Sequence, residues 1–195
     1  MSQIERLNSK PSRTAPVALV LPGAGYTVQA PLLYWPVLAL TQAGWDVWSV
    51  NWHDDVKGPA PRDIAQFVED AVVQALAELP DAPAAVIGKS LGTYALPYFV
   101  DREVWAAWLT PNLTDSRIAQ AARSASRRHL FVGGTADPTW RPEGILNSRA
   151  ETISVESGNH SLETAETGWQ NSALEQLEML RRLVDHVMAR PSATR

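Results

Sequence analysis

The pentapeptide Gly88-Lys89-Ser90-Leu91-Gly92 places a serine between two glycines, directly after the apolar run at residues 84–87. In a Gly-x-Ser-x-Gly turn, a strand passes sharply into a helix and leaves the serine hydroxyl exposed for nucleophilic attack. The small flanking residues keep the strand and the helix from colliding. The helix begins at its positive dipole end, which places the Leu91 N–H to donate to a developing oxyanion. The alternative is a plain strand–helix turn with Ser90 as a helix cap.

A serine hydroxyl is a weak nucleophile and needs a base, so the places of the four histidines decide between these interpretations. His53 precedes the serine, His129 begins an expected strand at the wrong end, and His186 lies in the last turns of the terminal helix. His160 follows the last expected strand, on a Gly-Asn loop that can carry it back over the sheet edge. In the chain order of nucleophile, acid and base, His160 is the predicted base.

The base needs an acid to orient it, and that acid should follow the preceding strand. Asp137 lies in the loop after the apolar run at residues 130–133, so its carboxylate could hold the second nitrogen of the His160 ring. Alone, Asp137 would be interpreted as a turn residue before Pro138. Its position between Ser90 and His160 favours the catalytic role, with Asp115 as the fallback acid.

Six apolar runs of strand length recur along the chain, at residues 17–21, 45–51, 84–88, 104–110, 130–133 and 152–155. Continuous apolar runs are typical of strands buried on both faces in a parallel sheet. Helical periodicity lies between them, most clearly at residues 64–79 and 174–187. The pattern Ser172-x-x-Glu175 predicts that the last helix begins at Ser172. This alternation predicts an α/β fold, whose chemistry collects beyond the carboxyl ends of the strands.

Composition narrows the classes of protein that fit. The chain has 195 residues, 45% of them hydrophobic, a net charge of −4 and no cysteine. Scattered basic residues predict no nucleic-acid partner, and the absence of cysteine excludes thiolate zinc sites and a cysteine nucleophile. No apolar stretch approaches the roughly 20 residues of a membrane span. We therefore expect a cytoplasmic protein with no membrane partner, no cofactor and no metal.

Together the segments Gly88–Gly92, Gly133–Asp137 and Gly158–Ser161 make the chain resemble an α/β-hydrolase of the small, cap-less kind, similar to dienelactone-hydrolase-like and small serine-hydrolase members. The resemblance runs from about residue 17 to 187. It implies a three-layer fold with helices on both faces of a mostly parallel sheet. It also implies a second oxyanion donor in the Leu21–Tyr26 loop, at Ala24 or Gly25, with Ala24 at the expected position.

The chain departs from many family members in length. Too few residues precede Val17 for the usual extra antiparallel strands, so we expect about six strands in one domain at residues 16–189, with flexible termini at 1–15 and 190–195. Residues 110–115 leave no room for a lid domain. An open site without a lid predicts short acyl groups, with Trp52 and Trp140 near the pocket.

The sequence predicts a serine hydrolase that cleaves a small carboxylic ester. The triad is Ser90, Asp137 and His160, and the oxyanion donors are Ala24 and Leu91. An acyltransferase or thioesterase would use the same groups, and a non-catalytic binding or scaffold protein could keep the fold. The predicted partner is a small acyl substrate, and the sequence leaves its identity and the oligomeric state open.

Overall fold

The computed structural model describes residues 2–9, 11–56, 63–164 and 168–189. Its strands are β1 (Gln3–Arg6), β2 (Val17–Leu21), β3 (Asp46–Asn51), β4 (Ala85–Lys89), β5 (Trp105–Leu109), β6 (His129–Gly134) and β7 (Glu151–Val155). They form one sheet in the order β1-β3-β2-β4-β5-β6-β7, in which β1 is antiparallel and all the others are parallel. The six strands predicted from apolar runs are confirmed, with ends shifted by at most one residue.

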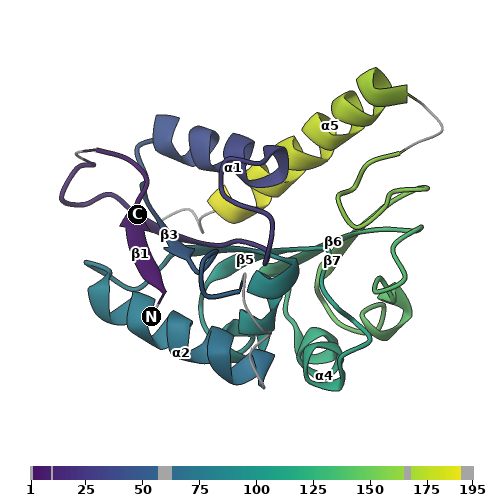
Figure 1. The fold of residues 1–195 in the computed structure, drawn as a ribbon, viewed down its shortest axis with the longest axis horizontal. Coiled ribbons are helices and arrows are strands. Elements are labelled where there is room, and N and C mark those ends of the chain that lie inside the picture. Colours follow the sequence, from purple (N-terminus) through teal and green to yellow (C-terminus); the bar gives the residue numbers. More distant parts are fainter. Residues whose placement is uncertain (1, 10, 57–62, 165–167, 190–195) are drawn as a thin grey trace, which may run out of the picture.

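The α-helices are α1 (Pro31–Gln42), α2 (Ile64–Glu78), α3 (Leu96–Phe99), α4 (Ser116–Ser124) and α5 (Gly168–Met188), with 3₁₀ turns at Ser90–Ala95 and Pro142–Gly144. Figure 1 shows α1 and α5 on one face of the sheet and α2 and α4 on the other. Two buried apolar clusters match this division, one under α2, α3 and α4 and one under α1 and α5. The predicted three-layer arrangement is therefore confirmed.

The first strand corrects the prediction of a flexible segment over residues 1–15. Gln3–Arg6 pair antiparallel with the outer edge of β3 and give the sheet a seventh strand. The Arg6 guanidinium holds both carboxylate oxygens of Asp46 at 2.9 and 2.7 Å and lies over the Trp48 ring. The sequence Gln-Ile-Glu-Arg has no apolar run because an edge strand is only half covered, and pairing with β3 supplies its stability. The predicted flexible segment 190–195 lies outside the described residues.

Helix α5 begins at Gly168. The prediction from the capping pattern that it begins at Ser172 is therefore wrong. Ser172 lies inside the helix, where its buried hydroxyl accepts a hydrogen bond from the Thr164 N–H (3.0 Å). Glu175 accepts from the Thr164 hydroxyl (3.1 Å). The two residues that resembled a cap instead attach the preceding loop to α5. No helix within the described ranges has the length and apolar character needed to cross a membrane.

Candidate active site

Ser90 lies directly after β4, at the turn that the sequence predicted. Its φ is +51°, a left-handed conformation that costs a non-glycine residue about 1–3 kcal/mol and collects at functional sites. The flanking glycines allow this turn to pack. A Cβ on Gly92 would lie 2.0 Å from the Leu21 carbonyl oxygen, and one on Gly88 would lie 2.8 Å from the Trp108 ring. Both positions therefore exclude larger residues for a steric reason.

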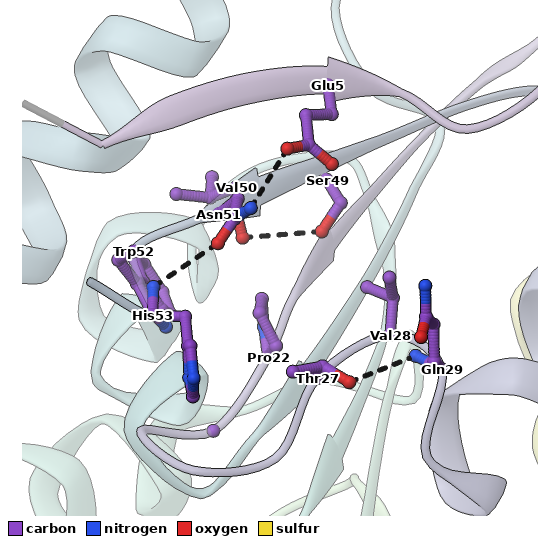
Figure 2. A pocket seen from close by; sticks show the side chains of 11 residues that line it. Glu5, Pro22, Thr27, Val28, Gln29, Ser49, Val50, Asn51, Trp52 and His53 are labelled. Atoms are coloured by element: carbon purple, nitrogen blue, oxygen red, sulfur yellow. Dashed lines mark hydrogen bonds between the residues drawn. The ribbon is translucent and has the colours of Figure 1, made fainter. Parts of the chain in front are cut away.

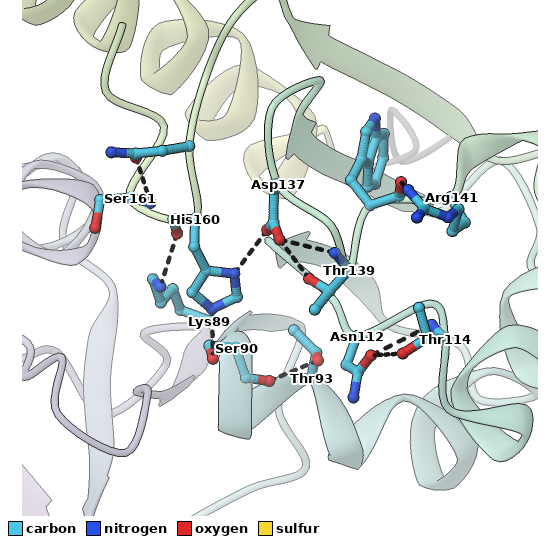
Figure 3. A network of polar contacts seen from close by, with 12 residues as sticks. Lys89, Ser90, Thr93, Asn112, Thr114, Asp137, Thr139, Arg141, His160 and Ser161 are labelled. Carbon is cyan, nitrogen blue, oxygen red and sulfur yellow. Dashed lines mark hydrogen bonds and ion pairs between the residues drawn. The ribbon is translucent and has the colours of Figure 1, made fainter. Parts of the chain in front are cut away.

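The three predicted triad side chains lie in one hydrogen-bonded chain (Figure 3). His160 Nε2 is 2.9 Å from Ser90 Oγ, and His160 Nδ1 is 2.6 Å from Asp137 Oδ2. The residues follow three different strands, β4, β6 and β7, whose carboxyl ends share one edge of the sheet. A neutral imidazole with its proton on Nδ1 would accept from the serine hydroxyl and donate to the carboxylate.

The Asp137 carboxylate is buried, and hydrogen bonds keep it ionised. It is 2% exposed, and its Oδ1 accepts hydrogen bonds from the Thr139 N–H (2.9 Å) and the Thr139 hydroxyl (2.8 Å). Burial opposes ionisation, but the hydrogen bonds from Thr139 and His160 outweigh it and hold the pKa of Asp137 below its ordinary value. The fallback acid, Asp115, instead caps α4 by accepting from the Arg117 and Ile118 N–H groups.

The three histidines outside the triad have other surroundings. His129 is fully buried and accepts from Trp108 Nε1 (3.0 Å), and burial lowers its pKa to about 4. His186, near the end of α5, lies 3.0 Å from the Arg128 carbonyl oxygen, and burial is the main cause that lowers its pKa. His53 lies in the wall of a cavity.

The loop that carries His160 is fixed by contacts that sequence reasoning missed. The Asn159 side chain accepts from the N–H groups of Ser161 (2.8 Å) and Glu163 (3.0 Å), which closes the loop around His160. The Gly158 carbonyl oxygen accepts from the Ala136 N–H (3.0 Å), so the loop is attached directly to the Asp137 loop. The available signal was Asn159 itself, because asparagine often bonds to the backbone a few residues on. Thr139, two residues after Asp137, carried a similar signal.

Lys89 is a further residue of the site whose place the sequence did not reveal. It is the last residue of β4, directly before Ser90, and it is 2% exposed. Its Nζ donates to the His160 carbonyl oxygen (3.1 Å) and lies 4.7 Å from the centroid of the Tyr26 ring. Burial lowers the pKa of Lys89 from 10.5 to about 8, and the Asp137 carboxylate opposes this shift.

We expect Lys89→Met to be more stable than the wild type at about pH 7. Each pKa unit is worth about 1.36 kcal/mol, so a pKa lowered from 10.5 to about 8 implies that the ionised lysine costs the folded state about 3 kcal/mol. Between these two values the unfolded chain binds more protons than the folded protein, so wild-type stability rises with pH. The advantage of methionine should shrink over this window. Chemical denaturation at about pH 7 and about pH 9.5 measures it, and an equal difference at both would contradict the reasoning.

The two predicted oxyanion donors belong to two segments that contact each other beside Ser90. Leu91 is the second residue of the 3₁₀ turn, where an N–H has no partner within its own helix. The β2–α1 loop approaches closely, since a Cβ on Gly23 would lie 3.5 Å from Ser90 Cβ. The Gly92 N–H donates to the Pro22 carbonyl oxygen (3.1 Å), which joins this loop to the serine turn. Ala24 is exposed on the same loop, and its role as a donor stays a prediction.

A cavity of about 170 Å³ lies beside the β2–α1 loop (Figure 2). Its wall includes Gly23, Trp52 and His53. On the side of β1 the lining is polar, and Asn51 donates to Glu5 across the strand pair (2.9 Å). Trp52 thus lines a cavity, but Ser90, Asp137 and His160 are not among the lining residues, so its place in a substrate pocket stays a prediction.

Trp140 does not line this cavity. It is 3% exposed, its ring fills the space beside Gly133, and its Nε1 donates to Ser154 Oγ (3.1 Å). Its position after β6 suggested the pocket, but a ring of this size at a strand end can equally complete the core, as it does here.

Comparison with solved structures defines the fold. Similar structures include a lid-less α/β serine hydrolase from Xanthomonas campestris (TM-score 0.61, 16% identity, 96% of this chain and 89% of that chain). Others are an α/β serine hydrolase homologue from Coxiella burnetii (0.61, 17%, 93% and 89%) and a dienelactone hydrolase from Anabaena variabilis (0.58, 16%, 92% and 98%). No protein-family model and no curated protein matches the chain. The chain has the α/β-hydrolase fold.

Proposed function

We propose that the protein is a serine hydrolase that cleaves a small carboxylic ester through an acyl-enzyme on Ser90. The observation that carries the proposal is the chain from Ser90 through His160 to the buried Asp137, with distances of 2.9 and 2.6 Å. The likeness in fold to serine hydrolases and to a dienelactone hydrolase supports the same class of reaction.

In the proposed reaction, His160 Nε2 takes the Ser90 hydroxyl proton while Oγ bonds to the acyl carbon. The carbonyl oxygen becomes an oxyanion, to which the N–H groups of Leu91 and Ala24 (or Gly25) donate. Collapse of this intermediate breaks the bond to the alcohol oxygen, which leaves with the proton from His160. A water then gives its proton to His160 and its oxygen to the acyl carbon, and Ser90 leaves with that proton. The products are an alcohol and a carboxylic acid.

Covalent labelling by a fluorophosphonate tests the proposal, and we expect one label per chain, on Ser90. A thioesterase or acyltransferase would react in the same way, so a panel of esters, thioesters and acceptor alcohols then separates the three activities. A folded protein that takes no label would favour the binding or scaffold alternative. A scaffold has no need of a carboxylate that is buried and aligned on a histidine, and this favours the enzyme.

Among p-nitrophenyl esters, we expect kcat/KM to peak at short acyl chains and to decline beyond them. A buried methylene gains about 0.8 kcal/mol only where walls exclude water, so an acyl site without a lid to cover it should stop rewarding chain length early. Residues 110–115 run directly from β5 to α4, so no lid is inserted there. A steady rise through long chains, or a jump in activity above the micellar concentration, would contradict this expectation.

A further inference from the structure

Lys89 lies where two loops meet the end of β4 beside the triad. It is the last residue of β4, directly before the serine turn, and a Cβ on Gly23 of the β2–α1 loop would lie 3.4 Å from the Lys89 Cδ atom. Its Nζ lies over the ring of Tyr26, on the same loop, and donates to the carbonyl oxygen of His160. Figure 3 shows this hydrogen bond beside the one between His160 and Ser90. One side chain therefore contacts the loop of the base and the loop of the predicted oxyanion donor.

An apolar side chain could fill this space at a lower free-energy cost of burial. Lysine is almost never fully buried unless it is paired, and among the described residues the only hydrogen-bond acceptor of Nζ is the His160 carbonyl oxygen. Both contacts of the ammonium depend on its charge. A hydrogen bond from an ionised donor is roughly twice as strong as one from a neutral donor, and a cation is attracted to the face of an aromatic ring.

Lys89 has a folded-state pKa of about 8, and several charged or titratable groups face it. The pKa of Asp137 lies below its ordinary value, so Asp137 is ionised near pH 8 and favours the ammonium form of Lys89. Burial raises the pKa of the Tyr26 phenol above its ordinary value of 10, with Glu163 adding to the effect. The Tyr26 hydroxyl also accepts from the Leu32 N–H (3.0 Å), which fixes the ring. His160, the remaining group, is the proposed base itself.

We propose that Lys89 is a positioning residue. Its ammonium group holds the His160 loop and the Gly23–Tyr26 loop in their positions beside Ser90, so that activity falls when this group loses its proton. The inference rests on the proposed hydrolase function. Lys89 does not contact the reacting atoms, because its Nζ binds the main chain of His160 and not the ring. A displacement of about 1 Å at a reacting group can cost about a hundredfold in rate, so a loose His160 loop would lower kcat more than it changes KM.

The test is the pH profile of kcat/KM on a short p-nitrophenyl ester for the wild type, Lys89→Met and Lys89→Arg. We expect the wild type to lose activity above about pH 8, in line with the pKa of the buried lysine. Lys89→Met should be about 10- to 100-fold less active at pH 7 and lack this alkaline decline. Lys89→Arg should also lack it, because a guanidinium stays charged throughout the range. Lys89→Met activity within twofold of wild type, or a decline that persists in either variant, would overturn the proposal.

Tyr26 offers a matched pair of variants that leaves Lys89 in place. Tyr26→Phe keeps the ring and Tyr26→Leu removes it, while both lose the hydroxyl. Because the ring favours the ammonium, the leucine variant should shift the alkaline decline to lower pH and the phenylalanine variant should not. Equal profiles in the two variants would count against the ring contact.

The rate of fluorophosphonate labelling separates failure of this inference from failure of the proposed function. If the folded wild type takes no label on Ser90, the hydrolase proposal fails. If Ser90 is labelled but the labelling rate of Lys89→Met keeps the alkaline decline, only the role of Lys89 fails.

Discussion

Ser90→Ala should abolish fluorophosphonate labelling and lower ester hydrolysis by several powers of ten. In serine proteases, loss of the nucleophile costs on the order of 10⁶ in kcat, and a residual rate remains from the oxyanion hole and substrate binding. The change removes one hydroxyl at the end of β4 and leaves the glycine contacts around it intact. Mass spectrometry of the labelled wild type and kcat measured for both proteins are the readouts.

Ser161→Ala is the matched control for this experiment. Ser161 follows His160 in the same loop, where its main-chain N–H donates to Asn159. Replacement of its side chain keeps that bond, so labelling and activity should stay close to wild type. A label found on Ser161, or a Ser90→Ala protein that is folded and still labelled, would remove Ser90 from the role of nucleophile.

Asp137→Asn should lower kcat by about 10⁴ with little change in shape, as in the well-studied triad. The structure gives the reason. Asp137 Oδ1 accepts from both donors of Thr139, so an asparagine there would keep its carbonyl oxygen toward Thr139 and turn its NH₂ toward His160. Nδ1 of His160 would then have to accept, its proton would move to Nε2, and that nitrogen could no longer take the Ser90 proton. Steady-state kinetics with thermal unfolding of each variant measures the loss.

Asp115→Asn is the control, because Asp115 is the acid that the chain order also allowed. It caps α4 by accepting from two main-chain N–H groups, and asparagine caps a helix about as well as aspartate. Its activity should therefore change little. The reverse result, with Asp115→Asn inactive and Asp137→Asn active, would assign the acid to the loop after β5.

The meeting of Ser90, Asp137 and His160 could be predicted from sequence because its signals are local and its geometry is generic. The glycines around Ser90 mark a sharp strand–helix turn, and apolar runs show where each strand ends. Parallel strands bring their carboxyl ends to one edge, so the residues after β4, β6 and β7 were expected to meet there. Order along the chain then chose Asp137 and His160 from several candidates.

The features that were missed depend on contacts between distant segments. Strand β1 has no apolar run and exists through its pairing with β3 and the Arg6–Asp46 ion pair. Ser172 has the right spacing for a cap, yet its hydroxyl binds Thr164 across the loop. Lys89 occupies a variable position of the serine motif, and lysine is typical of surfaces. Only the tertiary structure shows that it is buried under Tyr26 and His160.

In the proposed reaction, catalysis depends on one edge of the sheet. Ser90 follows the central strand β4, whereas His160 follows β7, the last strand in the order, with β5 and β6 between them. Outer strands open more readily than central ones in the native state, and a shift of β7 by one residue would turn its side chains to the opposite face. Brief separation of β7 would carry His160 away from a serine turn that remains intact. The proposed nucleophile and its proposed base thus belong to parts of the molecule with different local stability, and the more weakly held part sets the fraction of molecules in which the two are in contact at any moment.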